Sequence, residues 1–188
     1  MWKSCEIVQE MYFCGIILML IFIEVRKLEE KVGFTIGKFA PLHKGHQFLI
    51  ETALKEMDKV IVVVYDTDVT KVPTEERASW IKELYPNVEV RFAHNPPSKY
   101  GLDKDSVDIQ MKYLSEIVKD EKPTHFYSSE PYGKYVAEYL NIEDRRVDTE
   151  RKEVPISASI VRKDIERNKK WMDNLVYQDL KDKGVTNE

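Results

Sequence analysis

From Val32 onward, the chain alternates between two hydrophobic patterns, one with the period of a strand and one with the period of a helix. Short apolar runs predict strands at 32–36, 59–65, 88–93, 125–129 and 145–148. The run at 59–65 (KVIVVVY) is continuous and β-branched, which is typical of a strand buried on both faces. Helical spacing and capping residues predict helices at 45–57, 73–84, 105–119, 131–140, 160–167 and 170–180, with a loop at 94–103.

This alternation of strands and helices indicates the fold class. Repeated strand–helix–strand units predict an α/β domain with a parallel sheet and helices on both faces, a Rossmann-like, doubly wound arrangement. Such sheets bind ligands at the carboxyl ends of their strands, where the strand order reverses. No internal repeat, low-complexity segment or linker interrupts residues 32–188, so we expect this range to form one domain.

Residues 1–31 form an extension whose status the sequence leaves open. Met11 to Ile23 is apolar, but it is shorter than the roughly 20 residues that span a membrane. It is a poor signal peptide, because Glu6 and Glu10 occupy the region that should be basic. Three interpretations remain: a segment that packs on the domain or on a partner, a weak membrane anchor, or an upstream extension of a protein that starts near Met19. We favour the third and do not expect a membrane partner.

The composition of the 188 residues is that of a globular protein, with 43% hydrophobic and 33% charged residues. A formal net charge of −4 argues against a nucleic-acid partner, which requires a basic surface. Both cysteines, Cys5 and Cys14, lie in the first stretch, which fits a reducing cytoplasm without disulfides. No Cys/His cluster has the spacing of a zinc site, so we predict no protein metal site.

The strongest chemical signal is the run Gly37 to His46 (GKFAPLHKGH), between the first predicted strand and the first predicted helix. His43 and His46 are three positions apart and would lie on one face at the mouth of that helix. A helix amino end favours anions, and two imidazoles there can donate to phosphate oxygens whose charge grows during a reaction. Gly45 would let backbone approach a phosphate closely, although Gly45 and Pro41 are also ordinary turn and helix-entry residues.

A second segment, Ile156 to Arg162 (ISASIVR), also combines groups that bind phosphate. Ser157 and Ser159 can cap a helix that starts near Ile160, and Arg162 supplies a cationic fork that matches phosphate oxygens. Alone, this segment would be an ordinary helix cap with a surface arginine. Its occurrence downstream of the histidine motif favours a phosphate site to which both segments contribute.

Together the two segments resemble the HxGH nucleotidyltransferase superfamily, whose motifs are G-x-F-x-P-x-H-x-G-H and I-S-S-T-x-I-R. The second match has small-residue variants at 158 and 159 and a valine at 161. Three more segments narrow the resemblance to the nicotinamide-nucleotide adenylyltransferase domain of NadR-type proteins, over about residues 32–177: Thr74 to Trp80, Ser128 to Gly133, and Asp148 to Arg151. NadR-type proteins often carry a kinase domain after this one, but the chain has no Walker A run, so we expect no kinase activity.

The resemblance implies a nucleotidyltransferase-type fold and direct adenylyl transfer, in which the 5′-phosphate of nicotinamide mononucleotide attacks the α-phosphorus of ATP to give NAD and pyrophosphate. Catalysis would come from positioning and charge stabilisation, and Mg²⁺ would bridge phosphate oxygens of ATP. The implied catalytic residues are His43 and His46. The implied ATP- and phosphate-binding residues are Gly37, Lys38, Phe39, Gly45, Ser157, Ser159 and Arg162.

Candidates for binding the acceptor are Arg77, Trp80, Tyr132 and Arg151. The two aromatic residues can stack on a cationic ring, and the two arginines can pair with a phosphate. Competing interpretations remain for two of them, because Trp80 falls on a predicted helix where core packing is common. Arg151 has Asp148 and Glu150 nearby as simple ion-pair partners.

Other functions also stay open. Within the superfamily, adenylyl or cytidylyl transfer to another small phosphorylated acceptor, such as phosphopantetheine or glycerol 3-phosphate, is the main alternative. An aminoacyl-tRNA synthetase would need a K-M-S-K-S-like loop and a basic RNA-binding domain, and the chain has neither. A non-catalytic nucleotide sensor has no need for the full set of histidines, serines and arginine. A homo-oligomer is compatible with the sequence.

Overall fold

The computed structural model describes residues 30–98, 101 and 103–185 of the chain. Five parallel strands form one sheet in the order β3-β2-β1-β4-β5, as expected for a Rossmann-like fold. Their bounds are β1 Val32–Gly37, β2 Lys59–Tyr65, β3 Glu89–Ala93, β4 His125–Ser128 and β5 Glu143–Arg146. The predicted extension, including the apolar segment Met11 to Ile23, lies outside the described residues apart from positions 30 and 31.

Six α-helices are found among the described residues, and they follow the predicted order. They are α2 Lys44–Glu56, α3 Thr74–Leu84, α4 Lys104–Val118, α5 Gly133–Leu140, α6 Ala158–Lys163 and α7 Asn174–Asp182. Short 3-10 turns at Lys119–Glu121 and Lys169–Trp171 follow α4 and precede α7. None of the helices in this part of the chain has the length and apolar character needed to cross a membrane.

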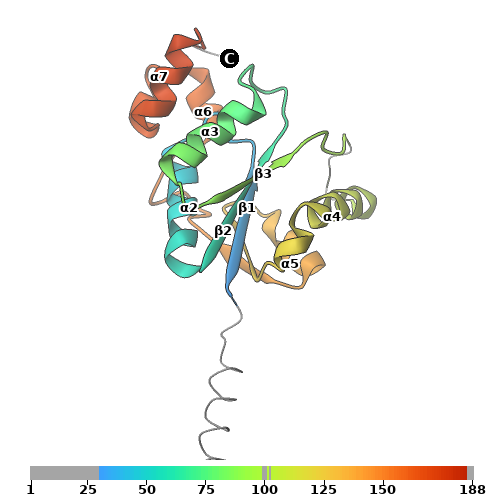
Figure 1. Cartoon of the computed structure of the whole chain (residues 1–188). Coiled ribbons are helices and arrows are strands. Elements are labelled where there is room, and N and C mark those ends of the chain that lie inside the picture. Colours follow the sequence, from blue (N-terminus) through green and yellow to red (C-terminus); the bar gives the residue numbers. More distant parts are fainter. Residues whose placement is uncertain (1–29, 99–100, 102, 186–188) are drawn as a thin grey trace, which may run out of the picture. The chain divides into compact units, whose positions relative to one another are not determined.

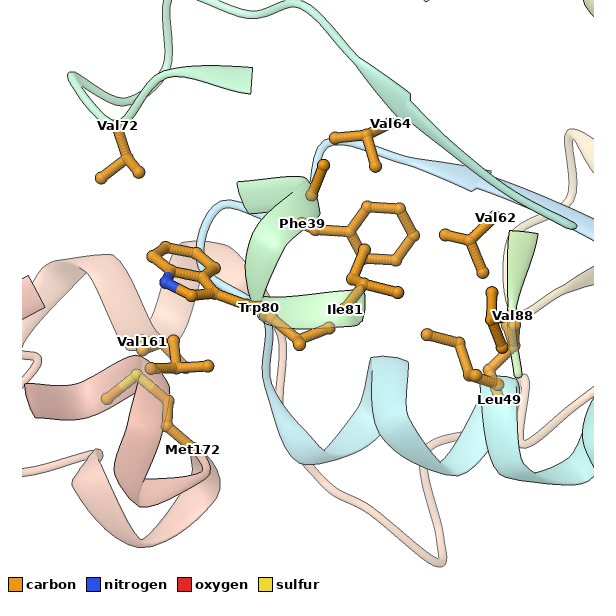
Figure 2. Packing of buried hydrophobic residues seen from close by; sticks show 14 of the residues in the cluster. Phe39, Leu49, Val62, Val64, Val72, Trp80, Ile81, Val88, Val161 and Met172 are labelled. Atoms are coloured by element: carbon orange, nitrogen blue, oxygen red, sulfur yellow. The ribbon is translucent and has the colours of Figure 1, made fainter. Parts of the chain in front are cut away.

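The helices cover both faces of the sheet (Figure 1). Successive residues of β2 point to opposite faces, so Val62 and Val64 join one core cluster and Ile61 and Val63 join the other. The first cluster packs α2 and α3, together with α6 and α7, against the sheet, and Figure 2 shows its centre. The second cluster packs α4 and α5 against the opposite face. The continuous apolar run of β2 is explained by this burial on both sides.

The order of the strands reverses beside β1. The chain forms β1, β2 and β3 in one direction across the sheet, and then returns to place β4 and β5 on the other side of β1. The carboxyl ends of β1 and β4 therefore diverge into separate loops, which leaves a crevice between them. The histidine motif leaves β1 at this point.

Three elements differ most from their predicted positions. The helix predicted at 160–167 is observed at Ala158–Lys163, because Asp164 has an extended backbone that ends the helix. The strand predicted at 145–148 is observed at Glu143–Arg146, because this edge strand is polar and only its pairing with β4 defines it. The helix predicted at 170–180 is divided, because the Asp173 side chain accepts a hydrogen bond from the Leu175 amide and caps a new helix there.

Candidate active site

A cavity of about 570 Å³ opens at the carboxyl ends of β1 and β4. Its walls come from the loop after β1, the first turn of α2, the loops that follow β4 and β5, and the start of α6. All of the predicted site residues except Arg77 and Trp80 line it. They are Gly37, Lys38, Phe39, His43, Gly45, His46, Tyr132, Arg151, Ser157, Ser159 and Arg162.

The two histidines form a rigid pair at the start of α2. His43 caps the helix, with its Nδ1 accepting a hydrogen bond from the Gly45 amide at 3.1 Å. His46 Nδ1 accepts from the His43 amide at 3.4 Å, which completes a reciprocal capping box. The two rings stack with centroids 3.8 Å apart and planes inclined by 20°. Gly45 fits tightly here, because a Cβ at that position would lie 3.0 Å from the His43 ring.

The protonation state of the pair follows from these bonds. Since Nδ1 accepts in both rings, each neutral imidazole carries its proton on Nε2. Burial lowers the pKa of His43 to about 4, and the charge of Arg151 acts in the same direction. Burial also holds the pKa of His46 well below its ordinary value, with further contributions from His43 and Arg151. Both rings are therefore neutral at physiological pH, and each retains one Nε2–H donor.

The turn that carries the histidines has a strained backbone. Phe39 has φ = 48°, a left-handed conformation that costs a residue with a side chain about 1–2 kcal/mol. The Phe39 ring is 2% exposed and meets the His46 ring at an angle of 66°, with centroids 4.9 Å apart. Strain of this kind persists only where surrounding contacts hold it. Phe39 thus supports His46 from the core side of the turn.

The second motif lies on another wall of the same cavity and is bonded to the first. The Ser157 Oγ accepts from the Ile160 amide at 3.4 Å and lies 3.0 Å from the Ser159 Oγ. Arg162 Nη1 donates to the carbonyl oxygen of Ala40 at 2.6 Å, across 122 positions of sequence. The hydroxyls, the guanidinium and the two imidazoles therefore share one cavity, as the sequence predicts.

Tyr132 and Arg151 line a further part of the cavity. Tyr132 is partly buried, and burial raises the pKa of its phenol to about 12, so that it stays protonated. Arg151 Nη2 pairs with Glu130 Oε1 at 3.0 Å, and the two side chains are 40% and 66% exposed. Glu150, a partner that the sequence suggests, pairs with Lys152 instead.

Asp148 organises the loop that presents Arg151. Its carboxylate accepts hydrogen bonds from the amides of Lys152 (2.7 Å), Glu153 (3.2 Å) and Val154 (2.9 Å). Burial disfavours the charged carboxylate, but these amides outweigh it and hold the pKa of Asp148 below its ordinary value. Asp148 and Arg151 both have left-handed backbone, with φ of 46° and 51°. The carboxylate therefore fixes the path of the loop around Arg151.

The prediction that Arg77 binds the acceptor is corrected by its position. Arg77 is 1% exposed and lies outside the cavity wall. Its Nε donates to the Val72 carbonyl at 3.1 Å, and its Nη1 donates to the carbonyls of Tyr65, at 2.9 Å, and Lys38. Its Nη2 donates to Thr74 Oγ1 at 2.8 Å. These bonds hold backbone rather than a ligand.

Trp80 is also a structural residue rather than an acceptor contact. It is 2% exposed, and its ring packs in the core cluster with Val72, Val161 and Met172 (Figure 2). Its Nε1 donates to Asp179 Oδ2 in α7 at 2.7 Å. The competing interpretation of a core tryptophan on a helix is the one that the structure supports.

Glu130 and Asp148 line the cavity without having been predicted as site residues. Both fall inside segments that carry the family resemblance, but the neighbouring sequence of neither residue predicts its hydrogen-bond partner. Glu130 meets Arg151 across 21 positions, and Asp148 binds amides of its own loop. The signal in the sequence was that they lie within the family-like segments at 128–133 and 148–151.

A divalent cation finds no protein site in the part of the chain that the structure describes. No three His, Cys, Asp or Glu side chains are grouped there as metal ligands. Asp148, one of the two carboxylates that line the cavity, already accepts hydrogen bonds from backbone amides. The residues therefore do not fit a resident metal, and Mg²⁺ stays a prediction tied to the nucleotide.

Comparison with known proteins identifies the family of the chain. The family model described as Cytidylyltransferase-like matches residues 34–164. The trifunctional NAD biosynthesis/regulator protein NadR of Salmonella typhimurium is 26% identical over 159 residues, covering 74% of this chain and 38% of the relative. A phosphopantetheine adenylyltransferase of Clostridium perfringens is 34% identical over 96 residues, covering 48% of this chain and 58% of the relative.

Solved structures agree on the fold. A crystal structure of NadR in complex with NAD and AMP-PNP superposes with a TM-score of 0.62 at 22% identity, covering 79% of this chain and 46% of that chain. The structure of a bifunctional NMN adenylyltransferase/ADP ribose pyrophosphatase from Francisella tularensis superposes with a TM-score of 0.53 at 18% identity, covering 80% of this chain and 52% of that chain. The chain spans less than half the length of the NadR relatives that it matches.

Proposed function

The chain belongs to the cytidylyltransferase-like family of nucleotidyltransferases, and we propose that within it the protein joins ATP and nicotinamide mononucleotide to give NAD and pyrophosphate. The family match covers both phosphate motifs. The relatives named NadR, together with the NadR structure that holds NAD and AMP-PNP, support a nicotinamide-type acceptor. Those matches cover 74% and 79% of this chain, against 48% for the match to phosphopantetheine adenylyltransferase, which favours the nicotinamide-type acceptor.

The observation that carries the proposal is the convergence of both motifs on one cavity. The neutral His43 and His46 rings face it from one wall, and Ser157, Ser159 and Arg162 face it from another. The Arg162–Ala40 hydrogen bond keeps the two walls in register. A triphosphate bound between them would meet imidazole donors at its α-phosphate and hydroxyl and guanidinium donors at its outer phosphates.

The reaction is a single displacement at phosphorus. An oxygen of the acceptor's 5′-phosphate attacks the α-phosphorus of ATP, a new P–O bond forms, and the bond to the β-phosphate bridging oxygen breaks as pyrophosphate leaves. No protein nucleophile is needed. The Nε2–H groups of His43 and His46 donate to oxygens whose negative charge increases in the transition state, while the stacked rings keep them in place. Magnesium would arrive with the nucleotide phosphates.

The loops after β4 and β5 would hold the acceptor. Arg151 is suited to the acceptor phosphate, because it lines the cavity close enough to both histidines to lower their pKa values. Tyr132 is an aromatic surface on which a cationic pyridinium ring can stack. Lys38 is exposed at the cavity and adds a cation to the phosphate side.

Pyrophosphate release tests the proposal. Purified protein is incubated with ATP, Mg²⁺ and one acceptor at a time: nicotinamide mononucleotide, nicotinate mononucleotide, phosphopantetheine or glycerol 3-phosphate. We expect release with nicotinamide mononucleotide, with NAD as the chromatographic product, and release at least about a hundredfold slower from the His46→Ala variant. Release with phosphopantetheine as the sole active acceptor would identify phosphopantetheine as the substrate instead, in line with the similarity to phosphopantetheine adenylyltransferase. ATP binding without release from any acceptor would favour a sensor.

A further inference from the structure

Arg77 is a buried cation whose hydrogen bonds end on neutral oxygens. The carbonyls of Tyr65 and Val72 and the hydroxyl of Thr74 surround its guanidinium, and the carbonyl of Lys38 completes the set. Asp66 is linked to the guanidinium through Thr74, which donates from its Oγ1 to Asp66 at 2.6 Å. Burial lowers the pKa of Arg77, with Asp66 and Glu75 opposing it. A buried charge without a direct ion pair is costly, so it requires an explanation beyond packing.

The carbonyls that the arginines reach flank the strained residue of the histidine turn. Arg77, from α3, binds the carbonyl of Lys38, and Arg162, from α6, binds the carbonyl of Ala40. Between them lies Phe39, whose left-handed backbone needs external support. Two cationic groups from separate helices therefore hold the turn on either side of Phe39.

The effect of this support reaches the histidines. The Phe39 ring packs in the core beside Val64 and Ile81 (Figure 2), and it also contacts the His46 ring. His46 in turn stacks on His43. A shift of the Lys38 carbonyl would move Phe39 and change the direction of the two Nε2–H donors. Arg77 reaches the reacting phosphates only through this chain of contacts.

We propose that Arg77 is a positioning residue for nucleotidyl transfer, which fixes the Lys38–Ala40 turn and thereby aims His46 at the α-phosphate. This inference rests on the proposed nucleotidyl transfer and does not depend on which acceptor is used. The proposal gives Arg77 and Arg162 different roles, because Arg162 lines the cavity and Arg77 does not.

The test compares two variants with a matched control. Arg77→Lys keeps the charge but loses the fork that spans several carbonyls, and Thr74→Val removes one acceptor of that fork while leaving the arginine. The control is Arg91→Lys, because Arg91 also donates to a backbone carbonyl, that of Ile117 at 2.6 Å, on a part of β3 away from the cavity. Unfolding curves give the folded fraction to which each rate is normalised.

Steady-state kinetics with the acceptor found active above is the first readout. For Arg77→Lys we expect kcat to fall by about tenfold or more, because small displacements of catalytic groups are costly, while the KM of the acceptor changes little. Thr74→Val should lower kcat by a smaller factor, and Arg91→Lys should have the same kcat as the wild type. A raised acceptor KM with normal kcat would overturn the proposal and restore a ligand-binding role. An unchanged kcat in folded Arg77→Lys would overturn it as well.

The second readout is the ¹⁵N NMR spectrum of the histidine side chains in the free protein, which needs no acceptor. In wild type we expect ¹⁵N signals of His43 and His46 that report Nε2–H tautomers. Arg77→Lys should shift the His46 signals while those of His125, at the amino end of β4, stay in place. Unmoved His46 signals would overturn the proposal even if nicotinamide mononucleotide proved not to be the substrate. Moved signals would support it in the same circumstance.

Discussion

The two halves of the cavity are built in different ways. On the phosphate side, the His43 and His46 rings are stacked, bonded to backbone and supported by a buried aromatic ring. On the proposed acceptor side, Arg151 forms an exposed ion pair with Glu130, and both residues lie on the loops that follow β4 and β5. Rigid donors suit a step shared by the whole family, whereas exposed side chains on loops can change with the acceptor.

This difference explains what comparison with known proteins can and cannot transfer. The family match spans the rigid phosphate motifs, and it therefore supports the reaction class. Relatives with different names, NadR and phosphopantetheine adenylyltransferase, both match this chain. We expect the identity of the acceptor to depend on the other half, where Arg151 and Glu130 are exposed on loops. The following predictions measure each half in turn.

Removing a donor on the phosphate side should have the largest effect. We expect His46→Ala to lower kcat by at least about a hundredfold, because one well-placed donor to developing charge contributes about 3–4 kcal/mol. Pyrophosphate release under saturating ATP and acceptor measures it. His125→Ala is the control, since His125 pairs with Glu143 at the far end of β4. Near-normal turnover of His46→Ala would refute its role.

The neutral state of His43 should make stability depend on pH. The pKa of His43 in the folded protein, about 4, lies below its ordinary value of 6.5, so acid adds a proton to the unfolded chain before it adds one to the folded protein. The contribution of neutral His43 to the free energy of unfolding is complete above pH 6.5 and declines as the pH falls toward 4. Between the unfolded pKa and about pH 5, His43 should remove about 2 kcal/mol from the free energy of unfolding.

The matched variant for this dependence is His43→Asn. Asparagine keeps a side-chain oxygen at the helix cap but does not titrate. Denaturant unfolding across the same pH range should show a shallower decline than in wild type. Parallel curves for the two proteins would contradict the neutral assignment, because the titrating group would then lie elsewhere.

On the acceptor side, Arg151→Gln should raise the KM of the acceptor by about tenfold, as expected when one charge-assisted contact to a phosphate is lost. ATP affinity should change less, because Ser157, Ser159 and Arg162 remain. Lys152→Gln is the control from the same loop: Lys152 is highly exposed and pairs with Glu150. Equal effects of the two substitutions would indicate a general charge effect instead.

The smallest effect is expected from Glu130→Gln. Glu130 competes with the acceptor phosphate for Arg151, so its neutralisation should lower the acceptor KM, by up to about fivefold because exposed ion pairs are weak. Kinetics at low and moderate salt should show the difference shrinking as salt is added. An increase in KM would mean that Glu130 contacts the acceptor itself.

Several expectations about individual residues required the folded structure to correct them. Arg77 and Arg151 both lie within family-like segments, and nothing local separates them, yet Arg77 is buried on α3 and Arg151 lines the cavity. Trp80 was ambiguous for the same reason. The loop at Asp148 depends on hydrogen bonds to backbone amides, which a string of side-chain types does not reveal.

The order of the strands and helices, and the residues of the two motifs that meet in the cavity, could be predicted from the sequence. The periods of hydrophobic residues placed β2 at its observed bounds, and two motifs identified the histidines, serines and Arg162. These are short-range properties, set by which residues lie within one turn or one strand. Only the tertiary structure decided that both imidazoles are neutral, that Arg77 supports the Lys38–Ala40 turn, and that Arg151 pairs with Glu130. Burial, pKa and hydrogen-bond partners arise from contacts between distant segments, so they exist only once the chain has folded.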